Sequence, residues 1–170
     1  MAAELGAGGA ACAIASFDAK RPAAPQLEAV PFRPNQSYYF PTSKIFRQKL
    51  GLFSRELFDE FNDVYSVGFF AVCQFFSGGE PVKVFYPSSI AVEERPRDLT
   101  EYAMAKAASE VLCDDIDAFM AGVSVLRRRL PRLATDQTAT LTKVETASAV
   151  DVMAEIVGEM AGLEDFNLTR

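Results

Sequence analysis

Histidine is absent from the 170 residues, and only three cysteines are present. Without an imidazole the chain cannot form a Ser-His or Cys-His triad, a proximal-histidine haem site or the usual catalytic zinc site. Cys12, Cys73 and Cys113 lie far apart with no C-x-x-C pair, which favours reduced thiols over disulfides or a metal centre and predicts a cytoplasmic protein. We therefore expect no metal, and proton chemistry must use another acid or base.

Positive charge and long apolar runs are also scarce. The 17 Lys and Arg residues against 23 Asp and Glu residues give a net charge of -6, which argues against nucleic acid or an anionic membrane as a partner. No run of about 18 apolar residues exists, so no membrane span is expected. With 49% hydrophobic and 24% charged residues, the composition indicates one globular domain that binds small molecules or proteins.

Residues 1–35 show no sustained period of 2 or 3.6 and are rich in alanine, glycine and proline. We predict a flexible segment there, followed by one domain over residues 36–170. The sequence GAGGAA, Gly6 to Ala11, matches G-x-G-x-x-A. It lacks a hydrophobic strand before it and prolines follow soon after, so a dinucleotide-binding loop is not favoured.

From residue 36 the pattern alternates between strand and helix. Strands are expected at residues 37–40, 82–86 and 123–130, and helices at residues 54–76, 99–119 and 147–160, with Ser54 and Thr100 as N-caps. This alternation predicts an α/β fold with a parallel sheet. In the last helix we expect five side chains to face inward: Val150, Met153, Ile156, Val157 and Met160.

The helix at residues 99–119 contains the sequence EYAMAKAASE, in which Tyr102 and Lys106 lie one turn apart. Ser89 stands 13 residues before Tyr102, just past the strand expected at residues 82–86. Ligands of parallel α/β sheets bind at the carboxyl ends of the strands, so these three residues are predicted to meet in one crevice. The alternative is a pair of helix-surface residues with no role in binding.

The longer segment KVFYPSSIAVEERPRDLTEYAMAKAASEVL resembles the central part of the short-chain dehydrogenase/reductase superfamily, and the similarity runs from about Ser37 to the C-terminus. The resemblance implies part of a doubly wound, Rossmann-like parallel sheet flanked by helices. It also implies oxidoreductase or epimerase chemistry with NAD or NADP on a small carbonyl compound or secondary alcohol. The sequences YPSSIAVEERP and YAMAKAASE are similar to those of the extended, epimerase-like branch. The 13-residue spacing between Ser89 and Tyr102 is instead typical of single-domain reductases.

The resemblance assigns catalytic roles to three residues. Tyr102 would be the general acid/base, and the ammonium of Lys106 would favour its phenolate. Lys106 would also bind the nicotinamide ribose, and Ser89 would hold the substrate oxygen. Ser88 is the second candidate for substrate binding.

Thr135 and Asp136 match the place where members of this family contact the amide of the cofactor, and Pro131 belongs to the same cofactor-facing loop. An N-cap role for Thr135 and Asp136 is an alternative. Many family members place an asparagine three residues before a glycine in the preceding helix. Tyr65 occupies that place here, and we interpret Tyr65 as an edge of the core and Asn62 as solvated.

The first three strands of the family, with their glycine-rich pyrophosphate loop, have no counterpart in residues 1–35. The chain is similar to the second half of the fold only. We therefore expect a homo-oligomer or a partner chain that supplies the missing half of the sheet. The alternatives are a truncated product, or an inactive assembly module that uses the helix at residues 54–76 as its interface.

Overall fold

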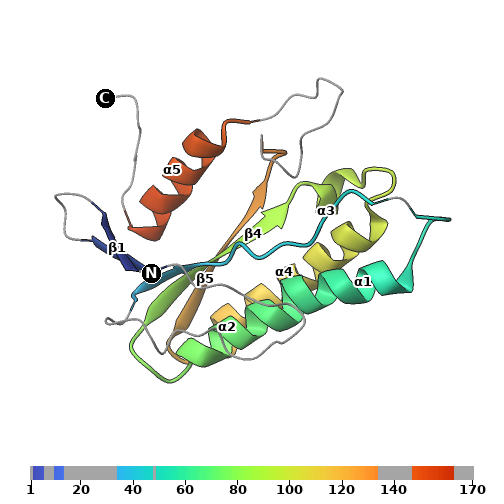
Figure 1. Cartoon of the computed structure of the whole chain (residues 1–170). Coiled ribbons are helices and arrows are strands. Elements are labelled where there is room, and N and C mark those ends of the chain that lie inside the picture. Colours follow the sequence, from blue (N-terminus) through green and yellow to red (C-terminus); the bar gives the residue numbers. More distant parts are fainter. Residues whose placement is uncertain (1, 6–9, 14–33, 48, 134–146, 163–170) are drawn as a thin grey trace.

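The computed structural model describes residues 2–5, 10–13, 34–47, 49–133 and 147–162 (Figure 1). Its centre is a parallel sheet of three strands, β3 (Gln36–Tyr38), β4 (Val82–Ser89) and β5 (Val123–Leu130), with β4 in the middle. Helices cover both faces of the sheet. The predicted α/β class and parallel sheet are confirmed, and β5 has the predicted bounds.

Strand β4 alternates its side chains between the two faces of the sheet, as the period of 2 requires. Val82, Val84 and Tyr86 join the larger core cluster, whereas Phe85 packs with Ile156 on the opposite face. The strand continues through Pro87 to Ser89, beyond the end predicted at Tyr86. A proline is tolerated there because β3 pairs only with residues 83–85, so the missing N–H leaves no ladder bond to β3 unmade.

One long helical segment lies between β3 and β4 in the chain, as predicted for residues 54–76. It consists of α1 (Arg55–Asn62), the π-helix η3 (Asp63–Gly68) and α2 (Phe69–Phe76). The Oγ of Ser54 accepts a hydrogen bond from the N–H of Leu57, which confirms the predicted N-cap. The π-helical turn in the middle was not predicted.

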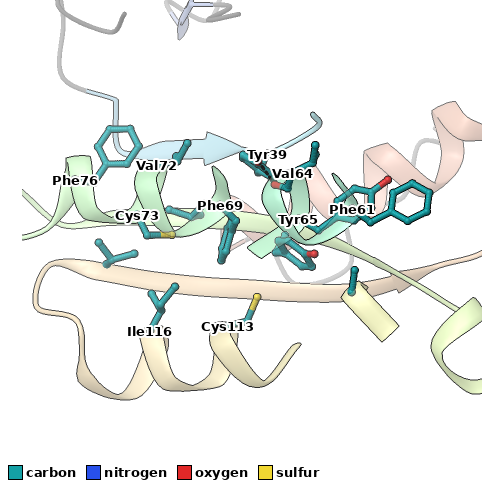
Figure 2. Packing of buried hydrophobic residues seen from close by; sticks show 14 of the residues in the cluster. Tyr39, Phe61, Val64, Tyr65, Phe69, Val72, Cys73, Phe76, Cys113 and Ile116 are labelled. Carbon is teal, nitrogen blue, oxygen red and sulfur yellow. Dashed lines mark hydrogen bonds between the residues drawn. The ribbon is translucent and has the colours of Figure 1, made fainter. Parts of the chain in front are cut away.

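Helix α4 (Thr100–Phe119) packs on β4 and β5 and also lies against α1 and η3. Leu99 is its N-cap and makes no side-chain capping bond, so the prediction that Thr100 caps the helix was wrong. A short helix that was not predicted, α3 (Ala91–Glu94), connects β4 to α4. Figure 2 shows how Phe69 and Cys73 from α2 meet Cys113 and Ile116 from α4 in the larger core cluster.

Helix α5 (Ala149–Met160) covers the other face of the sheet, where Ile156 and Met160 pack with Phe85. Met153 is partly buried, as the prediction of an inward face requires. Val150 and Val157 are 71% and 43% exposed, so the prediction that they face inward was wrong. The buried face is narrower than the sequence pattern suggested because this face of the described sheet has only three strands.

Two short antiparallel strands, β1 (Ala2–Leu5) and β2 (Ala10–Ala13), lie within residues 1–35, for which we expected a flexible segment. They form a sheet of their own and do not pair with the parallel sheet. The rest of residues 1–33 lies outside the described part of the chain.

Candidate functional site

A cavity of about 1000 Å³ opens at the carboxyl ends of β4 and β5. Five of the predicted site residues line it: Ser88, Ser89, Tyr102, Lys106 and Pro131. Much of the remaining wall is apolar, with Phe40, Ile45, Leu99 and Leu130 among its residues. The expected convergence of strand ends and α4 on one crevice is therefore present.

Lys106 projects from α4 toward the end of β4 and is 4% exposed. Its Nζ donates to the carbonyl oxygen of Pro87 at 2.6 Å and lies 3.8 Å from the centre of the Tyr65 ring and 4.8 Å from that of Tyr86. Burial lowers the pKa of Lys106 to about 7, although the nearby Cys113 and Glu110 act in the opposite direction. Lys106 therefore changes charge near neutral pH.

Tyr102 precedes Lys106 by one turn of α4 and is also buried. Burial raises the pKa of the Tyr102 phenol above its ordinary value, and a hydrogen bond with Ser89 partly offsets this rise. We expected the ammonium of Lys106 to favour the phenolate, but burial of the ring dominates. The phenol of Tyr102 is therefore protonated at neutral pH.

The two candidate serines have different surroundings. The Oγ of Ser89 accepts from the N–H of Ala91 at 3.2 Å and also hydrogen-bonds with Tyr102. The Oγ of Ser88 instead donates to Oε1 of Glu110 at 2.6 Å. Ser89 is thus the serine beside the phenol, whereas Ser88 connects the cavity to a charged network.

That network is centred on Glu110, two turns after Tyr102 on the same face of α4. Arg129 contacts both carboxylate oxygens, at 2.8 and 2.7 Å, and Arg127 lies 3.1 Å from Oε2. The hydrogen bonds from Arg129 lower the pKa of Glu110, burial opposes them, and the bond from Ser88 lowers the pKa further. Glu110 therefore remains ionised and holds Ser88 in place.

Tyr65 is more than an edge of the core. It is 1% exposed, lines the cavity, and its hydroxyl lies 2.8 Å from Oγ1 of Thr42. Its ring packs edge to face with Tyr102, at 5.6 Å between centroids. Tyr65 therefore contacts both members of the Tyr102 and Lys106 pair, whereas Asn62 does not line the cavity.

A buried ion pair anchors the chain before α1 to the start of α4. Nζ of Lys49 lies 2.5 Å from Oε2 of Glu101, and the side chains are 5% and 2% exposed. The other oxygen of Glu101 accepts from the N–H of Ser54. These contacts fix the first turn of α4, and with it the neighbouring Tyr102.

Sequence reasoning missed three of these residues: Glu110, Tyr65 and Lys49. The spacing of Glu110 from Lys106, one turn on, could have indicated its place on the same helix face. Tyr65 stands three residues before Gly68, where the resemblance places an asparagine, so that spacing was a signal for it. Lys49 carries no comparable signal, because its position depends on an irregular segment. Thr135 and Asp136 lie outside the described residues.

Chemically, the cavity combines a protonated phenol, a serine hydroxyl and an amine that titrates near neutral pH. This set can orient a carbonyl oxygen and protonate it. Within the described part of the chain, no three acidic, cysteine or histidine side chains are grouped so that they could hold a metal. Nor does any described helix have the length and hydropathy needed to cross a membrane.

The chain was compared with models of known protein families and with curated protein sequences, and neither comparison finds a match.

Proposed function

We propose that this cavity binds a small carbonyl compound or secondary alcohol and interconverts the two with NAD or NADP, as in the short-chain dehydrogenases/reductases that the sequence resembles. The observation that carries this proposal is the shared cavity at the end of β4, which is lined by Tyr102, Lys106 and Ser89. In the same proposal, β3, β4 and β5 are the second half of a doubly wound sheet. Among the described residues β3 pairs with β4 alone, which leaves room for a neighbouring strand.

Ser89 and Tyr102 would act on the substrate oxygen. Their mutual hydrogen bond places two hydroxyl groups side by side on the cavity wall, where both can hydrogen-bond one carbonyl oxygen. Because burial keeps the phenol of Tyr102 protonated, it would donate its proton to the oxygen as the carbonyl is reduced. The protonated phenol is the form that carbonyl reduction would require.

The cavity also fits the nicotinamide half of the cofactor. Its volume of about 1000 Å³ lies at the upper end of the range of ligand pockets, so a substrate and a nicotinamide can share it. Lys106 and Pro131 would hold this half, and the nicotinamide when bound would exchange a hydride with the carbonyl carbon. Gly6 to Gly9 and Thr135 lie outside the described residues, so no residue is assigned to the pyrophosphate.

Nucleotide binding provides the first test. The chain has no tryptophan, so the fluorescence of NADH or NADPH itself is followed as the full chain is added. We expect saturable binding that Lys106→Ala weakens about tenfold or more. Tyr38→Phe is the matched control, because Tyr38 hydrogen-bonds Gln36 and does not line the cavity.

Turnover provides the second test. A panel of small aldehydes and ketones is assayed by loss of NADPH absorbance, and Tyr102→Phe should lower the rate at least about a hundredfold while nucleotide binding persists. A folded chain that binds neither nucleotide would contradict the proposal. Equal rates in Tyr102→Phe and Tyr38→Phe would contradict the role of Tyr102.

Assembly is a second candidate function, supported by apolar side chains on the outer helices. Val67 and Phe70 are 42% and 39% exposed, and Met104 and Val111 on α4 are 44% and 64% exposed. Such surfaces often contact another protein. Light scattering should then give a mass above 18.6 kDa that Val111→Lys reduces. A monomer at all concentrations would reject this candidate.

A further inference from the structure

The side chain of Lys106 is a buried amine enclosed by aromatic rings. Three tyrosine rings surround its Nζ, at 3.8 Å for Tyr65, 4.8 Å for Tyr86 and 5.9 Å for Tyr102. These rings come from η3, β4 and α4, so the amine is enclosed from several sides.

The carboxylate nearest along the helix does not form an ion pair with Lys106. Glu110 stands one turn further on α4, but its oxygens are bound by Arg129, Arg127 and Ser88. Among the described residues, Lys106 makes no salt bridge. Burial without a counter-ion favours the neutral form, and it is the principal cause of the lowered pKa, about 7.

A neutral amine at the wall of a cavity is a nucleophile for carbonyl compounds. We propose that Lys106 forms a reversible imine with aldehydes that enter this cavity, independently of any nucleotide. Much of the wall is apolar, Phe40, Ile45 and Leu99 included, so a small uncharged aldehyde can enter beside Lys106.

The reaction is balanced without an oxidant or a reductant. The lone pair of Nζ forms a bond to the carbonyl carbon, and the π pair of the carbonyl moves to its oxygen. Both hydrogens of the amine then leave with that oxygen as water, and a C=N bond remains. Tyr102, which keeps its proton and lines the same cavity, protonates the departing hydroxyl group and recovers a proton from the nitrogen, so it is unchanged at the end. Hydrolysis reverses every step.

The imine is trapped by reduction. The full chain, without nucleotide, is incubated near pH 7 with propanal and cyanoborohydride, and the propylated lysines are located by peptide mass spectrometry. At this pH about half of Lys106 is neutral, against on the order of one in a few thousand of a lysine with an ordinary pKa. Burial reduces this advantage, and we expect Lys106 to be modified at least about tenfold faster than the exposed lysine side chains.

Lys83 is the internal control in the same sample. Its Nζ also donates to a backbone carbonyl, that of Glu159 at 3.0 Å, but it does not line the cavity. Faster labelling of Lys106 than of Lys83 and Lys44 supports the proposal. Equal or slower labelling of Lys106 overturns it. The labelling contains no NADPH, so either result is separable from the fate of the proposed reductase activity.

Discussion

Nζ of Lys106 lies 3.8 Å from the centre of the Tyr65 ring, although the two residues are 41 positions apart in the sequence. The contact brings a residue of the π-helix onto the amine of the Tyr-x-x-x-Lys motif. A cation above an aromatic face is stabilised by about 0.5 to 2 kcal/mol. That gain does not offset the cost of burying the charge, since the pKa of Lys106 is still lowered. The position of Tyr65 thus determines how the amine is enclosed.

The charge of Lys106 should make folding stability depend on pH. The folded state releases the proton near pH 7, whereas an unfolded lysine releases it near about 10.4, so the unfolded state binds more protons in between. Lys106 should therefore contribute a rise in the free energy of unfolding with pH across this window. Lys106→Met should remove the rise, as measured by urea unfolding at several pH values in a reducing buffer. Parallel pH profiles for the two proteins would show that Lys106 is not shifted.

The buried pair of Lys49 and Glu101 should be costly to break from one side. Glu101→Gln keeps an acceptor for the N–H of Ser54 but leaves the buried charge of Lys49 with the carbonyl oxygen of Leu52 and without its carboxylate. We expect a loss of about 3 kcal/mol in the free energy of unfolding. Adding Lys49→Met should recover part of this loss, because no uncompensated charge then remains.

The ion pair of Arg47 and Glu60 is the control for the Lys49 and Glu101 substitutions, because its side chains are 34% and 39% exposed. Glu60→Gln should cost less than about 1 kcal/mol. If the losses for Glu101→Gln and Glu60→Gln were equal in denaturant unfolding, the Lys49 and Glu101 pair would contribute no more than a surface contact.

Glu110 should stabilise the fold above its unfolded pKa. Its pKa is lowered in the folded state, chiefly by Arg129, so its contribution is complete above about pH 4.3 and is lost as the pH falls through the folded pKa. Glu110→Gln should lower the melting temperature at neutral pH, and its difference from the unmodified chain should shrink in acid. The control is Asp114→Asn, since Asp114 also contacts Arg127 but is 66% exposed. Equal effects of the two substitutions at neutral pH would contradict the central place of Glu110.

Gly122 should resist any side chain. It has a φ of +78°, and a Cβ there would lie 3.2 Å from the carbonyl oxygen of Gly79. Gly51 has a φ of +82° and open space around it, so its substitution measures the cost of the backbone conformation without a steric clash. We expect Gly51→Ala to cost about 1 kcal/mol and Gly122→Ala about 2 kcal/mol or more by denaturant unfolding. Equal losses would mean that the turn near Gly79 adapts to the methyl group.

The sequence pattern predicts most of the fold because each element has a local signal. Ser54 begins the long helix, and Val123 and Val125 alternate with Ser124 at the start of β5. The end of β4 was missed because Pro87 normally stops a strand, and only the short length of β3 explains why it does not. The exposed Val157 shows a second limit of prediction from sequence, since the width of a helix's buried face depends on the area of the sheet that it packs against.

The candidate site was predictable in part for the same reason. Tyr102 and Lys106 are related by one helical turn, and Ser89 by its place at a strand end, so sequence spacing indicates their meeting point. Lys49 reaches Glu101 across 52 positions through an irregular segment, which no local pattern encodes. Whether burial or the neighbouring charge controls the pKa of Tyr102 also depends on packing.

Because of the π-helix η3, the position of Tyr65 beside Lys106 depends on the number of residues between α1 and α2. Its hydrogen bonds run from i to i+5, so it accommodates one residue more than an α-helical path of the same length. Deleting one residue between Asp63 and Gly68 would therefore join α1 and α2 into one regular helix whose two ends keep their places. Phe69 and Cys73 anchor α2 in the core, so the adjustment would fall on the residues of η3, Tyr65 among them. A single-residue deletion at this point would therefore change how Tyr65 covers Lys106 while leaving the sheet in place.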